Sequence, residues 1–279
     1  MPEDLHYLNC AYMAPRSERV ELAGIEAIQR ERNPTQITPE TFFADSDRVR
    51  GLFGQLINAD PSRIALIPAV SYGIATVARN LQISAKQNIV LLHEQFPSNV
   101  YGWRRLQAST GCTIRTVSVH EDEPDRGRRW NERILESIDD STALVAMGTV
   151  HWADGTRFDL EAIGRRAREV GAAFVLDGTQ SIGAMPFDAA KLQPDAVVCA
   201  GYKWLLGPYS LGVAYYGPRF DDGIPLEESW ITRANSQHFA GLVEYEDSYQ
   251  PGAVRFDMGE RSNFILTPML AAALEHLLD

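Results

Sequence analysis

The sequence predicts a three-layer α/β domain built on a mostly parallel sheet of seven strands. Seven short runs rich in apolar and β-branched residues recur along the chain, and segments with helical spacing lie between most of them. Several of these runs are apolar throughout, as expected for strands that helices cover on both faces. The predicted strands are 64–67, 88–92, 114–119, 143–147, 173–176, 196–200 and 211–216.

The helices are predicted from apolar residues three or four positions apart. An extended opening stretch comes first, and two helices follow it at 18–32 and 39–59. The segment 160–170 carries Leu160, Ile163, Ala167 and Val170 on one face, which is typical of a helix packed on a sheet. The remaining predicted helices are 72–81, 99–109, 130–137 and 268–279.

The composition is that of an ordinary globular protein and argues against nucleic acid as a partner. Of the 279 residues, 45% are hydrophobic and 23% are charged, which allows a substantial core. The formal charge is -11, from 26 basic and 37 acidic residues, whereas a nucleic-acid-binding protein needs a basic face for the phosphates. The basic run Arg126, Arg128 and Arg129 has acidic neighbours, so we expect a solvated loop there.

The N-terminal residues and the cysteines predict a cytoplasmic protein without a membrane span, a disulfide or a metal site. The opening MPEDLHYLNC lacks the basic start and apolar stretch of a secretory signal, and no run approaches the ~18 apolar residues of a membrane span. Cys10, Cys112 and Cys199 are odd in number and lack the spacing of metal ligands. Cys199 lies within an apolar strand, so we expect a buried small hydrophobe.

Polar residues follow three of the predicted strands, and ligands of open α/β sheets gather where strands end. Asp177 follows the fifth strand, Lys203 follows the sixth, and Ser71 begins the helix after the first. Each has an ordinary explanation when taken alone: a turn-forming acid, a surface lysine and a helix cap. The start of a helix also offers free N–H groups and a positive dipole end to an anion.

Taken together, these three places resemble the class V aminotransferases, the superfamily of cysteine desulfurases, kynureninases and isopenicillin-N-epimerase-like proteins. The anion-binding turn comes first, the acid follows, and the lysine stands 26 positions later (203 minus 177). Residues 177–180 (Asp-Gly-Thr-Gln) resemble the family's motif of Asp, two small residues and Gln after a strand. Residues 202–203 (Tyr-Lys) resemble its pair of an aromatic residue or His with Lys. The resemblance covers residues 5–275 and implies fold type I with pyridoxal 5'-phosphate as cofactor.

The resemblance implies a role for each polar residue of these motifs. Lys203 forms a Schiff base with the cofactor aldehyde, and the incoming amino-acid substrate displaces the lysine. Asp177 keeps the pyridine nitrogen protonated, so that the ring accepts electrons from the substrate. Gln180 hydrogen-bonds the ring hydroxyl oxygen.

The cofactor phosphate needs a nest of hydrogen-bond donors. By family position these are the backbone and hydroxyl of Ser71, the backbone of Tyr72 and the side chain of Tyr202. Ala200 stands where desulfurases often have a hydroxyl group. One donor of the family's set is therefore missing or replaced.

Aromatic residues are expected to enclose the ring. Phe96 belongs to a Phe-Pro pair that resembles kynureninases, where desulfurases have His, and it is the candidate for stacking on the ring. A core Phe at a strand end is the alternative. Trp152 lies where many relatives have Asn beside the cofactor, and His151 lies next to it. Both residues are expected to line the site, with a satisfied structural His as the alternative for His151.

We expect an N-terminal segment at 1–40, the large cofactor-binding domain at 41–255, and at 256–279 the start of a linker to a small domain that the chain lacks. Class V enzymes usually bind the substrate carboxylate with an arginine of that small domain, after a loop that resembles 255–263. Arg16, on the opening stretch, is a candidate substitute. Relatives dimerise, and part of this loop often reaches the neighbouring phosphate, so we predict a homodimer.

Three functions are consistent with these residues. The preferred one is a pyridoxal-phosphate-dependent, aminotransferase-like enzyme. A kynureninase-like or C–S-cleaving lyase is the second, suggested by Phe96 and the Tyr202-Lys203 pair. A desulfurase is disfavoured because none of the three cysteines matches the family's persulfide cysteine. A catalytically silent, cofactor-binding fragment is the third.

Overall fold

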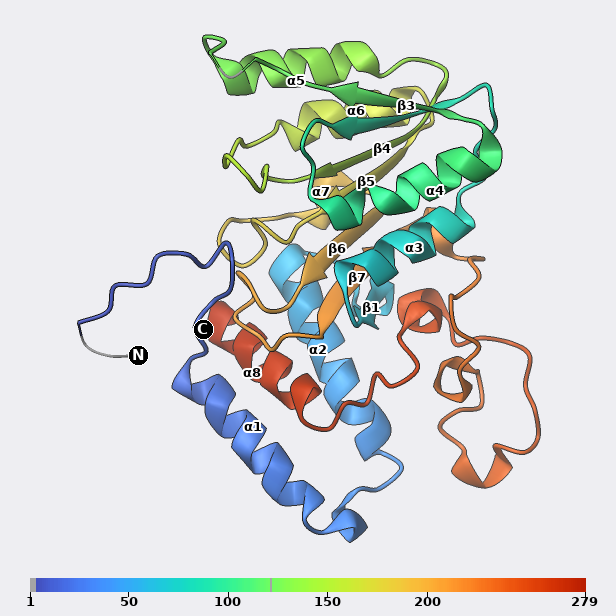
Figure 1. Cartoon of the computed structure of the whole chain (residues 1–279). Coiled ribbons are helices and arrows are strands. Elements are labelled where there is room, and N and C mark those ends of the chain that lie inside the picture. Colours follow the sequence, from blue (N-terminus) through green and yellow to red (C-terminus); the bar gives the residue numbers. More distant parts are fainter. Residues whose placement is uncertain (1–3, 121) are drawn as a thin grey trace.

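The computed structural model describes residues 4–120 and 122–279 and has the predicted three-layer α/β architecture (Figure 1). Its centre is a seven-stranded sheet with the strand order β1-β7-β6-β5-β4-β2-β3. Strand β7 runs antiparallel to both of its neighbours, and the other neighbouring pairs are parallel. The strands are β1 Ile64–Ile67, β2 Asn88–Leu92, β3 Thr113–Val117, β4 Thr142–Gly148, β5 Ala173–Asp177, β6 Ala196–Ala200 and β7 Gly212–Tyr216.

Helices cover both faces of this sheet, which explains why its central strands are apolar throughout. In β5, Phe174 and Leu176 pack on the side of α2, α5 and α6, whereas Ala173 and Val175 pack on the side of α3 and α4. The helices are α1 Glu18–Glu31, α2 Thr41–Ile57, α3 Val70–Asn80, α4 Tyr101–Thr110, α5 Arg126–Ser137, α6 Leu160–Glu169, α7 Ala189–Leu192 and α8 Leu266–Leu278. Every predicted helix is present, and the short α7 was not predicted.

The prediction of a loop at Arg126, Arg128 and Arg129 is wrong, because these residues form the first turn of α5. Two guanidinium groups share one carboxylate there: Arg128 lies 2.6 Å and Arg129 3.0 Å from Glu132. Such pairs, three or four positions apart, stabilise a helix. The charged side chains stay in solvent while the backbone is helical.

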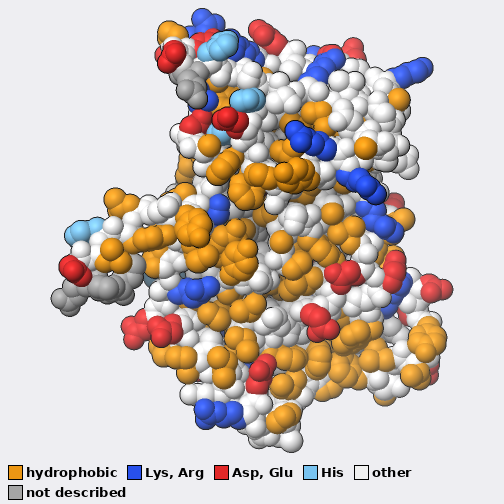
Figure 2. Space-filling model, viewed as in Figure 1, with side chains coloured by type: hydrophobic (Ala, Val, Ile, Leu, Met, Phe, Trp, Pro, Cys, Tyr) orange, Lys and Arg blue, Asp and Glu red, His pale blue; other side chains and the backbone are white. Residues whose placement is uncertain are grey.

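The N-terminal and C-terminal helices lie together at one side of the sheet, where α8 packs against α1 and α2 (Figure 1). Helix α1 buries Val20 and Ala27 but leaves Leu22, Ile25 and Ile28 about half exposed. The space-filling view accordingly shows hydrophobic side chains at the surface in the lower part of the molecule (Figure 2). This part of the fold therefore presents apolar surface to its surroundings.

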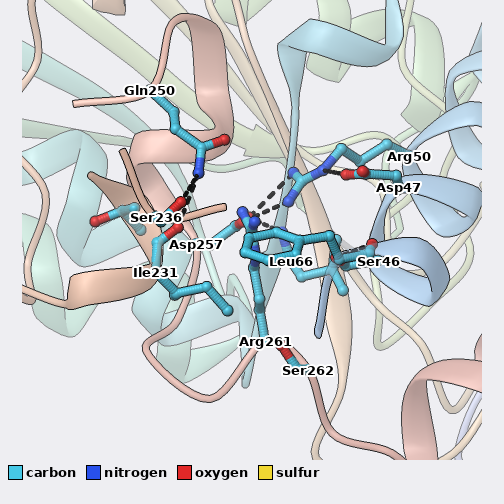
Figure 3. Close-up of polar contacts among 12 residues, drawn as sticks. Ser46, Asp47, Arg50, Leu66, Ile231, Ser236, Gln250, Asp257, Arg261 and Ser262 are labelled. Atoms are coloured by element: carbon cyan, nitrogen blue, oxygen red, sulfur yellow. Dashed lines mark hydrogen bonds and ion pairs between the residues drawn. The ribbon is translucent and has the colours of Figure 1, made fainter. Parts of the chain in front are cut away.

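A buried ionic cluster fixes the segment before α8 to the edge strand β1 (Figure 3). Asp257 accepts hydrogen bonds from Arg50, from Arg261 at 2.5 Å and from the amide of Leu66 at 2.8 Å. All three charged residues are almost completely buried. Arg50 also donates to the carbonyl of Ile64 at 2.5 Å. Arg261, which belongs to the segment 255–263, thus points into the interior and is held by Asp257.

Candidate active site

One cavity of about 380 Å³ opens at the carboxyl ends of β5 and β6. Its volume is in the range of about 300–1,000 Å³ that small-molecule sites occupy. Most of the predicted site residues line it: Ser71, Phe96, Trp152, Asp177, Gln180, Tyr202 and Lys203. Tyr72 does not line it. Residues from five different strand ends are therefore brought together, as the resemblance implied.

Lys203 lies in the turn after β6, and its side chain is buried. The turn requires glycine at position 201. Any other residue would place a Cβ atom 2.5 Å from the carbonyl oxygen of Leu211, which is too close. The Nζ atom lies 5.5 Å from the centroid of the Phe96 ring, and it has no carboxylate within 4.0 Å among the described residues. Burial lowers the pKa of Lys203, and the negative charge of Asp177 opposes this effect only in part. The neutral, nucleophilic form of this amine is therefore easier to reach than that of an exposed lysine.

Lys203 is one of only three lysines in the sequence. The other two, Lys86 and Lys191, are exposed, and Lys191 pairs with Glu161 at 2.6 Å. Neither lines the cavity. The chain therefore has a single lysine that a ligand in this cavity can reach.

Asp177 is the last residue of β5, and its carboxyl group is buried. Its Oδ1 atom accepts a hydrogen bond from the amide of Thr179 at 3.0 Å, whereas Oδ2 has no hydrogen-bond partner among residues 4–120 and 122–279. Burial raises the pKa of Asp177, while hydrogen bonds from Thr179 and the charge of Lys203 lower it. A buried carboxyl group with one free oxygen beside a cavity is suited to bind a cationic hydrogen-bond donor.

Ser71 lies in the first turn of α3, the helix that follows β1. Ala69 precedes this helix and provides no side-chain cap. Within the described chain, the amides of Val70 and Ser71 have no backbone acceptor. Free amides at the positive end of an eleven-residue helix are suited to bind an anion such as a phosphate.

Tyr72 differs from its neighbour Ser71. Its amide already donates to the carbonyl of Ala69 at 3.0 Å, and its side chain packs against both hydrophobic clusters of the core. Burial raises the pKa of its hydroxyl group. Neither its amide nor its side chain is therefore free to bind an anion in the cavity, and its packing anchors the first turn of α3.

Two aromatic side chains form a wall of the cavity. Phe96 and Trp152 meet edge to face, with ring centroids 5.4 Å apart. The Trp152 indole donates to the carbonyl of Glu94 at 2.7 Å, which fixes its orientation. Phe96 is 37% exposed, so it is a wall residue and not the core Phe that was the alternative.

Gln180 and Tyr202 connect the cavity to the N-terminal stretch. Gln180 donates to the carbonyl of Ala11 at 3.2 Å and accepts from the indole of Trp204 at 3.3 Å. The carbonyl of Tyr202 accepts from the amide of Ala14 at 3.0 Å. These contacts bring the opening stretch beside the site. Arg16 itself is exposed and does not line the cavity.

His151 lines the cavity but is held by structural contacts. One ring nitrogen, Nε2, lies 3.1 Å from the carbonyl oxygen of His93, and the other lies 3.2 Å from Asp154. The ring also packs on Trp130, with centroids 5.0 Å apart. This favours the structural alternative for His151.

The sequence analysis missed six polar residues that line the cavity: Gln95, Ser98, Asn99, Thr179, Tyr209 and Ser210. Gln95 donates to the carbonyl of Asn99 at 2.6 Å, and Asn99 accepts from the indole of Trp103 at 2.9 Å. Both lie beside the predicted Phe96, and this adjacency was the available signal. Thr179 lies within the 177–180 motif but was considered only as a small residue.

Two further findings concern the described part of the chain. No group of His, Cys, Asp or Glu residues there has the arrangement of a metal site. No helix there combines the length and the apolar character needed to span a membrane.

The fold is that of the pyridoxal-phosphate-dependent fold type I class. The chain belongs to the class V aminotransferase family, because the family model "Aminotransferase class-V" matches residues 38–228. This membership confirms the predicted fold, the predicted class of enzyme and pyridoxal 5'-phosphate as its cofactor.

Relatives and solved structures agree with this assignment. The chain is 28% identical over 229 residues to the "Uncharacterized aminotransferase YcbU" of Bacillus subtilis (strain 168), an alignment that covers 82% of this chain and 57% of that protein. The chain thus spans little more than half the length of that relative. A cysteine desulfurase from Thermococcus onnurineus NA1 shares the fold with a TM-score of 0.80 at 22% identity, covering 99% of this chain and 68% of the other. The structure of the cystine C-S lyase C-DES also shares the fold, with a TM-score of 0.84 at 19% identity. The match covers 99% of this chain and 72% of that one.

Proposed function

We propose that this chain is the cofactor-binding part of an aminotransferase-like enzyme that acts on an amino acid, with Lys203 as the residue linked to pyridoxal 5'-phosphate. One observation carries the proposal. The only cavity-lining lysine and a buried carboxyl group, Asp177, come from the ends of neighbouring strands and line one cavity without forming an ion pair.

The donors around the cavity suit this cofactor. When bound, pyridoxal 5'-phosphate supplies an aldehyde that condenses with amines and a ring that accepts electrons from the substrate. The free amides at the start of α3 and the hydroxyl of Ser71 would hold the phosphate, with the side chain of Tyr202 as a further donor. Phe96 would pack on the ring, Trp152 would lie beside it, and Gln180 would hydrogen-bond its hydroxyl oxygen.

Lys203 would serve both as the anchor and as the group that moves a proton. Its amine is buried and unpaired, which lowers its pKa and makes the neutral form that attacks a carbonyl group easier to reach. The Nζ atom lines the cavity that would also hold the substrate. There it can accept a proton from the substrate and return it.

Asp177 would hold a proton on the nitrogen of the ring. Its free Oδ2 atom would be the acceptor, and the amide of Thr179 keeps the carboxylate in place through Oδ1. Burial strengthens this charge-assisted hydrogen bond because little water competes for it.

A C–S-cleaving lyase is the second candidate, and the names of similar proteins favour it. A "Probable cysteine desulfurase" of Methanothermobacter thermautotrophicus is 33% identical over 160 residues, and C-DES is named a cystine C–S lyase. No cysteine lines the cavity, and Cys199 is buried, which raises the pKa of its thiol. A desulfurase mechanism, in which a cysteine of the cavity receives the sulfur as a persulfide, is therefore disfavoured. The second candidate is a lyase that cleaves the C–S bond without such a cysteine.

A panel of amino acids tests the proposal. The protein loaded with pyridoxal 5'-phosphate is incubated with each amino acid, and the products are identified by mass spectrometry. An aminotransferase gives the keto acid, whereas a lyase gives a fragment of the side chain. If the protein holds the cofactor but converts none of the amino acids, both enzyme functions are contradicted. The catalytically silent, cofactor-binding fragment is then the function that fits.

The homodimer belongs to the same proposal. The half-exposed apolar residues of α1, Leu22, Ile25 and Ile28, are consistent with a partner surface on this side. Light scattering coupled to size-exclusion chromatography measures the mass directly, and a monomer at micromolar concentration would contradict the proposal.

A further inference from the structure

Glu94 has a strained backbone at the point where the chain leaves β2 and enters the wall of the cavity. The amide of His93 still donates to the carbonyl of Val117 in β3, at 2.9 Å. Glu94 follows with a φ of 52°, in the left-handed region that residues other than glycine seldom adopt. Phe96 comes two positions later and lines the cavity. The strained residue therefore sets the direction in which the chain carries Phe96.

Two consecutive side chains of the loop after β4 hold this strained residue. The Nε2 atom of His151 lies 3.1 Å from the carbonyl oxygen of His93, and a carbonyl can only accept, so Nε2 is the donor. The indole of Trp152 donates to the carbonyl of Glu94 at 2.7 Å. Two neighbouring carbonyl groups thus accept hydrogen bonds from two neighbouring side chains, and we call this pair of donors the clamp.

The clamp restrains the dihedral angles that carry the strain. The carbonyl of His93 belongs to the peptide plane before the Cα atom of Glu94, and the carbonyl of Glu94 belongs to the plane after it. Rotations of these two planes are the φ and ψ of Glu94, so holding both planes holds both angles. A strained conformation persists only where the surrounding structure fixes it, and such residues concentrate at functional sites.

The ring of His151 has a fixed orientation, so its donor stays directed at the strained turn. The ring is 3% exposed and packs on Trp130, with centroids 5.0 Å apart. Its Nδ1 atom lies 3.2 Å from Asp154, which in turn pairs with Arg126 in the first turn of α5. A helix outside the cavity therefore supports the clamp.

We propose that the clamp of His151 and Trp152 holds Glu94 in its strained conformation and thereby fixes the phenyl ring that follows in the wall of the cavity. Phe96 carries this ring. His151 is a positioning residue, because it acts on the cavity through the backbone of another loop. This inference rests on the proposed packing of Phe96 on the cofactor ring.

Cofactor affinity tests the clamp. His151→Phe keeps a ring that can pack on Trp130 and removes the donor, so the turn relaxes and Phe96 loses its position. We expect the dissociation constant of pyridoxal 5'-phosphate, measured by equilibrium dialysis, to increase about fivefold, the effect of one lost hydrogen bond. His151→Gln places an amide donor near the position of Nε2 and should keep the affinity within about twofold of the wild type.

Variants of the strained turn show whether the clamp acts through it. His93→Ala removes an exposed side chain but keeps the carbonyl that the clamp needs, so it should bind the cofactor as the wild type does. Glu94→Asn makes the left-handed conformation less costly, because asparagine tolerates it better than glutamate. In that background His151→Phe should weaken binding by less than about twofold. A loss as large as in the wild-type background would overturn the inference.

A double-mutant cycle with Phe96→Ala separates this inference from the proposed function. Once the phenyl ring is absent, His151→Phe should change the affinity less than about twofold. An equal loss in both backgrounds would show a purely structural histidine and overturn the inference. If His151→Phe binds as the wild type does while Phe96→Ala binds weakly, the inference fails and the proposed role of Phe96 stands. If Phe96→Ala itself binds as the wild type does, that role fails, and the inference fails with it.

Thermal melts of the cofactor-free proteins show whether each variant folds. If His151→Phe does not fold, Trp152→Phe takes its place in both backgrounds, because it keeps an aromatic ring in the wall and removes the other donor of the clamp. The same outcomes then support or overturn the inference.

Discussion

Lys203 and Asp177 line the same cavity from the ends of adjacent parallel strands, yet they form no ion pair. In a direct ion pair the two charges would balance each other, and the amine would stay protonated. At the separation that the structure shows, burial dominates: it lowers the pKa of Lys203 and raises that of Asp177. The two groups are thus available to a ligand that fits between them.

Loss of the amine should release the cofactor. We expect Lys203→Ala to bind pyridoxal 5'-phosphate at least about tenfold more weakly and to lose the absorbance band of the lysine-linked cofactor. Lys191→Ala, which removes an exposed lysine paired with Glu161, is the matched control and should keep both. An unchanged spectrum in Lys203→Ala would contradict the role of this residue.

The rate of cofactor capture should depend on pH through Lys203. Only the neutral amine attacks an aldehyde, so the rate rises with pH until the amine is fully deprotonated. Because burial lowers the pKa of Lys203, the inflection of this profile should lie below the ordinary value of 10.5. In Asp177→Asn the supporting negative charge is gone, so the inflection should move to a still lower pH. Stopped-flow mixing of cofactor-free protein with pyridoxal 5'-phosphate measures the rate, and an inflection at or above 10.5 in the wild type would refute the expectation.

Asp177→Asn should weaken cofactor binding because an amide cannot balance a protonated ring nitrogen. We expect an affinity loss of about 10- to 100-fold, from the loss of one buried charge-assisted hydrogen bond. Asp188→Asn changes a helix-capping carboxylate at the exposed start of α7 and serves as the control. Equilibrium dialysis measures the affinity of both variants for pyridoxal 5'-phosphate. Equal affinities of Asp177→Asn and Asp188→Asn would contradict the proposed role of Asp177.

The buried cluster around Asp257 should contribute strongly to stability. Asp257→Asn leaves the guanidinium groups of Arg50 and Arg261 buried without a countercharge, which costs about 3–5 kcal/mol. Asp221→Asn breaks the more exposed pair with Arg63 and should cost less than about 1 kcal/mol. Urea denaturation followed by circular dichroism measures both, and similar midpoints would show that burial of the cluster does not matter.

Continuous apolar runs made the strands predictable. β1, β2 and β6 begin and end where the sequence predicted, because turn residues bound short apolar segments there. The antiparallel direction of β7 was not predictable, since strand direction depends on the connections and not on the local pattern. The start of α5 was missed because its first turn is charged and lacks an apolar face.

The site was predictable where a motif fixed residue types and not where geometry decides. Asp177 and Lys203 were expected in one site because their spacing and neighbours match a family pattern, and both line the same cavity. Thr179 was overlooked because its contact with Ala200 appears only when two strands lie side by side. The backbone of Tyr72 was expected at the phosphate, but its amide donates to the carbonyl of Ala69 and the residue does not line the cavity.

Mapping the lysine that carries the cofactor tests the central claim most directly. The loaded protein is reduced with borohydride, digested and sequenced by mass spectrometry, and the chain offers only Lys86, Lys191 and Lys203. We predict that the pyridoxyl group is found on Lys203. Its appearance on Lys86 or Lys191, or on no lysine at all, would contradict the account.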